Sequence, residues 1–158
     1  MKLFSYAWMA VALTGCLNSP LLNHADAATA SDQSQNSNGC AINLTKENLC
    51  ASLTWEKQPT EDDMGEFVLR FWDAQKGTES GPYLTAPDAV AVKLWMPSMG
   101  HGSSPVAVSP MHDSGNQVIP GVYDATNVYF VMPGAWQILI QLKQGSNIVD
   151  QATLDIQI

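Results

Sequence analysis

The stretch WQILIQLK, residues 136–143, decides the fold class. From Trp136 to Leu142 every second residue is apolar, and most of the residues between them are polar. This period of two is typical of a β-strand with one buried face, whereas a helix would place its apolar residues three and four positions apart. Because an apolar strand face must be covered by another layer, the stretch predicts one strand of a layered β-domain.

The same alternation recurs after Cys50, and clusters of turn-forming residues separate the runs. The further runs are residues 53–56, 67–72, 90–96, 106–108, 128–132 and 154–158. Turns are predicted at 62–65, 81–82, 114–116, 120–121, 133–134 and 145–147, where Gly, Pro, Asn, Asp and Ser gather. About seven short strands predict an all-β fold, an immunoglobulin-like β-sandwich, with a closed barrel as the alternative. Residues 45–48 are expected to add one helical turn.

The N-terminus carries the features of an export signal. Lys2 gives a positive start, and the apolar run from Leu3 to Leu13 is too short to span a bilayer. The run ends in Leu13-Thr14-Gly15-Cys16, which resembles the lipobox of bacterial lipoproteins, whose cysteine carries acyl chains after cleavage. The resemblance implies an anchor in the lipid bilayer through Cys16. The alternative is an ordinary signal peptide with an incidental cysteine.

The chain is therefore expected to have three parts. These are a lipoprotein signal peptide (1–15), a lipidated cysteine with a disordered tether (16–39) and one β-domain (40–158). The tether is rich in Ser, Asn, Ala, Asp and Gln, so it buries too little apolar surface to fold, and His24 within it is expected to be solvated. By resemblance to enterobacterial sorting, Asn18, which is not Asp, favours the outer membrane facing the periplasm.

Cys40 and Cys50 are the two cysteines left once Cys16 is assigned to the lipid anchor. An exported domain is in an oxidising compartment, which favours their pairing in a structural disulfide. The alternative is a thiol pair that binds metal or takes part in redox chemistry. The spacing does not match the C-x-x-C of redox motifs, so the disulfide is the prediction.

The chain is acidic, with 15 Asp and Glu residues against 7 Lys and Arg and a net charge of −8. It has no basic run. This composition argues against a nucleic-acid partner and against an electrostatic hold on anionic lipids. No G-x-S-x-G, P-loop or H-E-x-x-H motif occurs either, so an enzyme is not expected.

The segment MPSMGHG, residues 96–102, is the most unusual part of the chain, and Met111-His112 and Met132 follow it. Thioether sulfur is a soft, uncharged donor that suits Cu(I), and imidazole binds copper and zinc. Pro97 and the two glycines end the strand and turn the backbone. The next short strand is expected to return Met111 and His112 beside Met99 and His101, so all six residues are candidate copper ligands.

Each candidate also has a purely structural interpretation. Met96 and Met132 continue the inward faces of the strands before them, so core packing is favoured for both. For Met99 a ligand role and a solvent-exposed loop position are equally open. For His101 a ligand role is as open as its structural alternatives, which are a hydrogen bond to a nearby carbonyl or exposure to solvent. Met111 and His112 are weaker candidates, since Met111 would also fill the end of a sandwich. In this interpretation Trp136 is a corner residue that packs on one face and bonds through its indole N–H.

The segment MPSMGHG, then Gly121-Val122-Tyr123, then FVMPGAW at 130–136 together resemble the YtkA/FixH-like domain, over about residues 87–142. The resemblance implies an exported or membrane-tethered immunoglobulin-like domain, associated with metal-efflux or cytochrome-oxidase assembly proteins. It supports Met96, Met99, His101 and Met132 as the shared motif. Met111 and His112 are not part of that motif, and neither is the N-terminal half of the domain.

Two functions remain open from the sequence. The first is a copper accessory protein that sequesters or delivers Cu(I) through Met and His ligands. The second is a metal-free interaction or structural module that docks a partner through exposed aromatic residues such as Trp72, Trp95 or Tyr129.

Overall fold

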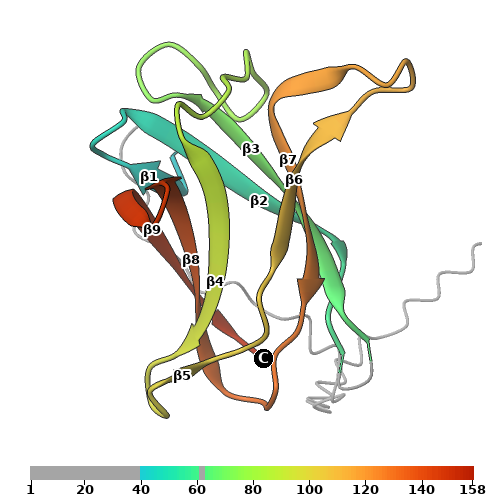
Figure 1. Cartoon of the computed structure of the whole chain (residues 1–158), viewed down its shortest axis with the longest axis vertical. Helices are drawn as coiled ribbons and strands as arrows, with labels where there is room; N and C mark the ends of the chain where they lie inside the picture. The colour runs from blue at the N-terminus through green and yellow to red at the C-terminus, as the bar shows by residue number, and fades with distance from the viewer. Residues whose placement is uncertain (1–39, 61–62) are drawn as a thin grey trace, which may run out of the picture.

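A computed structural model describes residues 40–60 and 63–158, and within these ranges the fold is all-β. Nine strands form two antiparallel sheets that face one another, as Figure 1 shows. The predicted β-sandwich is therefore confirmed. The predicted signal peptide, the predicted lipobox with Cys16 and the predicted tether with His24 lie outside the described residues. Among the described residues no helix has the length and apolar character needed to cross a membrane.

The first sheet has five strands in the order β1-β2-β3-β7-β6. Their bounds are β1 (Ile42–Leu44), β2 (Leu49–Lys57), β3 (Gly65–Asp73), β7 (Val118–Val128) and β6 (Ala107–His112). The second sheet has four strands in the order β5-β4-β8-β9. Their bounds are β5 (His101–Gly102), β4 (Ala89–Met96), β8 (Ala135–Gln144) and β9 (Asn147–Gln157).

The core lies between the sheets and is built by the predicted alternation. Phe67, Leu69 and Phe71 of β3 are fully buried on one side. Ile138, Ile140 and Leu142 of β8 are fully buried on the other. Each such side chain contributes roughly 1.5–3 kcal/mol through removal of its surface from water. The alternating rows of β3 and β8 are thus what hold the two layers together.

Strand β7 differs from the prediction because Pro120-Gly121 lies inside it and makes no hairpin turn. Gly121 has a φ of 70°, and a Cβ there would lie 2.6 Å from the backbone oxygen of Leu84. The glycine is needed for a left-handed backbone and for close contact with a neighbouring segment. The predicted strand over 128–132 is also wrong, because β7 ends at Val128 and the chain then forms a loop.

The predicted helical turn at 45–48 is wrong as well. These residues form the tight turn between β1 and β2, with Asn48 at a φ of 53°. Asp150 of β9 holds the turn, since its carboxylate accepts hydrogen bonds from the backbone N–H of Lys46 (2.8 Å) and of Glu47 (3.1 Å). The turn is thus stabilised by a contact more than a hundred residues away, which local sequence does not reveal.

Cys40 and Cys50 form the predicted disulfide, with a Cα–Cα distance of 5.3 Å. Both cysteines are buried and pack against Trp72 in a small cluster apart from the main core. Trp72 is only 2% exposed, so the expectation that it is an exposed docking residue is wrong. Its ring serves instead to cover the disulfide.

We expect the Cys40→Ala/Cys50→Ala variant to lose about 2–3 kcal/mol of unfolding free energy, because the cross-link restricts a short loop in the unfolded chain. Urea denaturation followed by circular dichroism measures this loss. Wild-type protein unfolded in the presence of a reducing agent is the control and should show a similar loss. Equal stability of the variant and the oxidised wild type would contradict the prediction.

Two carboxylates face each other on the outer side of the first sheet. Asp124 of β7 pairs with Val68 of β3, which places it diagonally beside Glu66. The pKa of Glu66 is raised, mainly by the charge of Asp124. Loss of solvation, a hydrogen bond with Asp124 and the charge of Glu56 act in the same direction, and Lys57 opposes them. The folded chain therefore holds a proton on Glu66 more tightly than the unfolded chain does.

A raised folded-state pKa means that stability falls as the pH rises through that pKa. We therefore expect Glu66→Gln to melt at a higher temperature than wild type at pH 7. The difference should disappear below the ordinary pKa of 4.5, where Glu66 is neutral in both states. Thermal melts across pH 3.5 to 8, with Glu79→Gln as a charge control, test this. A gain that persists at the lowest pH, below the ordinary carboxyl pKa of about 4, would be inconsistent with the proton linkage.

Candidate metal site

The β4–β5 hairpin presents the first half of the methionine and histidine motif at one end of the sandwich. The N–H groups of Met99 and Gly100 donate to the carbonyl of Met96 at 3.2 and 3.0 Å, which closes a tight turn. Gly100 has a φ of 66°, a left-handed conformation that favours glycine. The turn leaves Met99 60% exposed, so its thioether faces solvent.

Met96 and His101 are directly opposite each other across the β4–β5 pair. Opposed residues of antiparallel strands point to the same face, with Cβ atoms about 4.5–5.5 Å apart. Met96 is 3% exposed and packs in the core, as expected, whereas His101 is half-buried. A thioether and an imidazole therefore lie side by side where the core reaches the surface.

The ring of His101 is oriented by its own strand. Its Nδ1 lies 3.1 Å from the carbonyl oxygen of Gly102. A carbonyl only accepts a hydrogen bond, so Nδ1 is the donor in this contact. In the neutral ring the lone pair is then on Nε2. This is the arrangement usual for metal-binding histidines, whose second nitrogen donates to a carbonyl or carboxylate.

The loop between β7 and β8, residues 129–134, presents Met132. Its side chain is 36% exposed, so the expectation of core packing for Met132 is wrong. The reason is that the chain leaves the sheet at Val128, and the inward register of β7 stops there. Phe130 is buried within the loop and keeps it anchored to the core.

Trp136 joins the two halves of the motif. Its indole N–H donates to the carbonyl of Met132 at 3.0 Å, as expected for a corner residue. Its ring packs edge-on against Phe130 (centroids 5.3 Å apart) and against His101 (6.0 Å). The hydroxyl of Ser103 also donates to the carbonyl of Tyr129. The hairpin and the loop are thus fixed to each other, and we call Met96, Met99, His101 and Met132 the rim.

Gly134 makes room for Met96 beneath the rim. A Cβ at Gly134 would lie 2.8 Å from the methyl carbon of Met96. The residue has a φ of 140°, and its N–H and carbonyl exchange hydrogen bonds with Ile158 at 2.8 and 3.0 Å. Glycine is therefore required here for two reasons: it adopts this positive φ, and it leaves space for the side chain of Met96, a candidate ligand.

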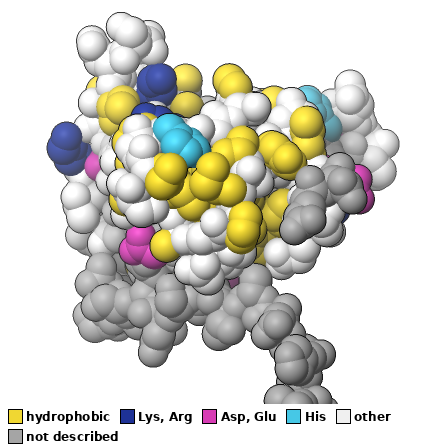
Figure 2. All heavy atoms as spheres, turned by 90° about the horizontal axis from the view of Figure 1, so that it is seen from below, with side chains coloured by type: hydrophobic (Ala, Val, Ile, Leu, Met, Phe, Trp, Pro, Cys, Tyr) yellow, Lys and Arg dark blue, Asp and Glu magenta, His cyan; other side chains and the backbone are white. Residues whose placement is uncertain are grey.

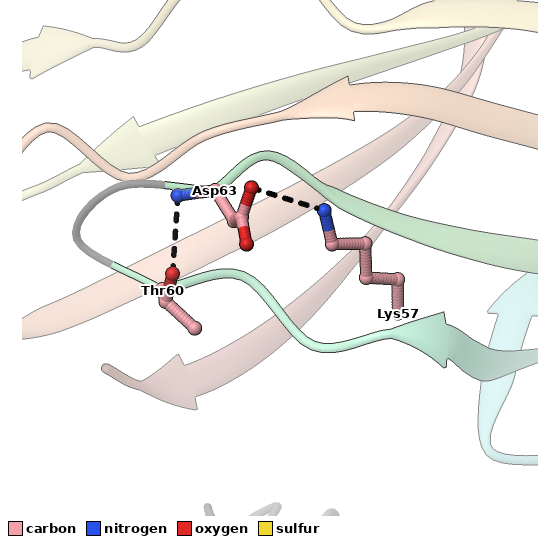
Figure 3. Close-up of polar contacts among 3 residues, drawn as sticks. All are labelled: Lys57, Thr60 and Asp63. Carbon is pink, nitrogen blue, oxygen red and sulfur yellow. Dashed lines mark hydrogen bonds and ion pairs between the residues drawn. The ribbon is translucent and has the colours of Figure 1, made fainter.

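Hydrophobic side chains gather on this end of the domain, beside a histidine (Figure 2). A groove of about 500 Å³ lies there, and its walls come from residues 59–60, residues 129–133 and Ile158. The wall at Thr60 belongs to the β2–β3 connection. There the backbone N–H of Asp63 donates a hydrogen bond to the hydroxyl oxygen of Thr60, and the ammonium group of Lys57 forms an ion pair with the carboxylate of Asp63 at 3.3 Å (Figure 3). Sequence reasoning missed the groove, because its walls are far apart in the chain.

Met111 and His112 are not part of the rim, so the expectation that they return beside Met99 and His101 is wrong. His112 pairs with Val118 at the start of β7, whereas the loop with Met132 follows the other end of that strand. At about 3.3 Å per residue, the length of β7 separates the two ends by roughly 30 Å. Figure 1 shows β5 and the β6–β7 turn at opposite ends of the sandwich.

The donor set of the rim is unusual for a metal site. Within residues 40–60 and 63–158, no three His, Cys, Asp or Glu side chains come close enough to hold an ion. The donors that do gather at the rim are thioethers and one imidazole. This set suits Cu(I), which prefers soft ligands, and poorly suits ions that need oxygen ligands.

Residues 56–141, just over half of the chain, match the model of the YtkA-like family. The chain belongs to the YtkA-like family. The match contains the whole rim and Trp136. It begins at residue 56, well before residue 87, where the resemblance seen in the sequence begins. No curated protein and no solved structure matches the chain significantly. Cys40, Cys50 and β9 lie outside the matched part of this YtkA-like chain.

We expect Gly134→Ala to lose about 1–3 kcal/mol of unfolding free energy, because alanine is strained at this φ and its Cβ displaces Met96. Gly145→Ala is the matched control. Gly145 also has a positive φ, of 60°, but nothing lies within 4 Å of a Cβ there. Its loss should be smaller, about 1 kcal/mol. Chemical denaturation compares the two, and equal losses would show that the Met96 contact has no effect.

Proposed function

We propose that this protein is a membrane-anchored lipoprotein whose β-sandwich handles copper, by sequestration or delivery, and binds Cu(I) at the rim. The observation that carries the proposal is the cross-strand pair of Met96 and His101 at the open end of the core. One side chain supplies a thioether and the other an imidazole, both on one face. Met99 lies in the turn between the two strands of this pair, and Met132 lies in the β7–β8 loop, which Trp136 and Ser103 hold through the carbonyls of Met132 and Tyr129.

Each rim residue has a part in the proposed binding. Met96 supplies a sulfur that is shielded from water, and His101 supplies Nε2 from a ring oriented by the carbonyl of Gly102. Met99 and Met132 are exposed, so their side chains are free to close over an ion that arrives from solvent. A site with two shielded and two exposed donors suits reversible binding, which sequestration and delivery both require.

The proposed location follows from the sequence. The lipobox with Cys16 supports an acyl anchor in the cell envelope, with the outer membrane facing the periplasm favoured. Outside the cytoplasm thiols are oxidised, as Cys40 and Cys50 are here, whereas thioethers keep their copper-binding form. The recipient or donor of the ion would be a metal-efflux or oxidase-assembly protein.

The test is an anaerobic titration of Cu(I) into the purified protein in competition with a chromogenic chelator. We expect wild type to bind one ion, and Met99→Ala/His101→Ala to bind at least about tenfold more weakly, since tenfold corresponds to about 1.4 kcal/mol. Met111→Ala/His112→Ala is the matched control: it removes the same two residue types at the far end and should bind as wild type does.

Failure of wild type to compete with the chelator would remove the copper proposal. The alternative, a metal-free module that docks a partner at the groove, would then be favoured. Equal loss in the two double variants would show that copper binds without regard to the rim, which also contradicts the proposal.

A further inference from the structure

The described methionines differ sharply in their exposure. Met99, Met64 and Met132 are 60%, 52% and 36% exposed, Met111 is half-buried, and Met96 is 3% exposed. Both cysteines in residues 40–60 and 63–158 are joined in the disulfide. Thioethers are therefore the oxidisable sulfur that this part of the chain offers to solvent. The reaction of methionine with oxidants follows the accessibility of its sulfur.

We propose that Met99 and Met132 form a modification site, where oxidation by a peroxide to methionine sulfoxide switches the rim from binding to releasing a soft metal ion. The modification itself depends only on exposure, whereas its effect on metal binding rests on the function proposed above. Two of the four rim donors are open to the oxidant, and the other two, Met96 and His101, are buried or half-buried.

Hydrogen peroxide alone supplies both the oxygen atom and the oxidising power for the conversion of methionine to methionine sulfoxide. A lone pair on the thioether sulfur attacks one peroxide oxygen, an S–O bond forms and the O–O bond breaks. The leaving hydroxide takes up the remaining proton as water. The sulfur loses two electrons and the peroxide gains them, so hydrogen peroxide is a sufficient co-reactant.

Oxidation changes the donor in two ways. The sulfoxide presents a polar oxygen where a soft sulfur stood, and a Cu(I) ion prefers the sulfur. The group is also larger and chiral, so a side chain that closes over an ion no longer fits in the same way. Met96 and His101 would then be the remaining donors. Because reductases return the sulfoxide to methionine, the change is reversible.

The first experiment treats the full chain with hydrogen peroxide and locates the added oxygen atoms by peptide mass spectrometry. Met64 is the internal control, since it is exposed but lies in the β2–β3 connection and not in the rim. We expect Met64, Met99 and Met132 to oxidise at least about tenfold faster than Met96. Preloading with Ag(I), a redox-inert substitute for Cu(I), should slow Met99 and Met132 but leave Met64 unchanged.

The second experiment measures Ag(I) binding before and after oxidation. We expect wild type and Met64→Leu to lose at least about tenfold in affinity on oxidation. Met99→Leu/Met132→Leu should bind weakly from the start and show no further loss. Treatment with methionine sulfoxide reductases should restore wild-type binding.

The outcomes separate the two proposals. If Ag(I) binds the untreated protein and binds equally well after Met99 and Met132 are oxidised, the switch is refuted and the proposed function stands. If Ag(I) does not bind the untreated protein, the proposed function fails and the switch fails with it. Oxidation of Met96 as fast as Met99 would refute the modification site directly.

Discussion

The indole of Trp136 connects the core of the sandwich to the rim. Its ring is buried against Phe130 and contacts the edge of His101, while its N–H holds the carbonyl of Met132 at 3.0 Å. A buried indole N–H without a hydrogen-bond partner is costly. The bond to the Met132 carbonyl therefore fixes the position of the loop that carries Met132. Through these contacts this one side chain links the loop that carries Met132 to the hairpin that carries His101.

The rim combines two kinds of constraint. Met96 is fixed by the core and by the space that Gly134 leaves, and His101 is fixed by the β4–β5 register and by the Gly102 carbonyl. Met99 and Met132 lie in connections where no strand pairing holds their side chains. A buried or half-buried pair beside two exposed thioethers would offer the proposed ion both a preorganised site and donors that solvent can reach, and an oxidant can reach the latter too.

Much of the fold could be predicted, because alternation along a strand reflects burial directly. The alternation predicts the runs over β3, β4, β8 and β9, and the expected oxidising compartment predicts the disulfide. The prediction failed at β7, where Pro120-Gly121 had the composition of a turn. Gly121 is required there by the close backbone of Leu84, a contact made by a distant segment. The alternation also predicts that the inward-facing positions continue to Met132, whereas the strand ends at Val128.

The sequence by itself determined the all-β class and supplied the candidate soft donors, and it predicted an export signal from the resemblance to a lipobox at Cys16. These depend on residue type and on neighbours along the chain. Only the tertiary structure decided that Met96, Met99, His101 and Met132 share one end of the sandwich while Met111 and His112 lie at the other. Strand direction and register are fixed by hydrogen bonds between distant segments, so the direction of β6, which its own residues do not encode, places Met111 and His112 away from the rim.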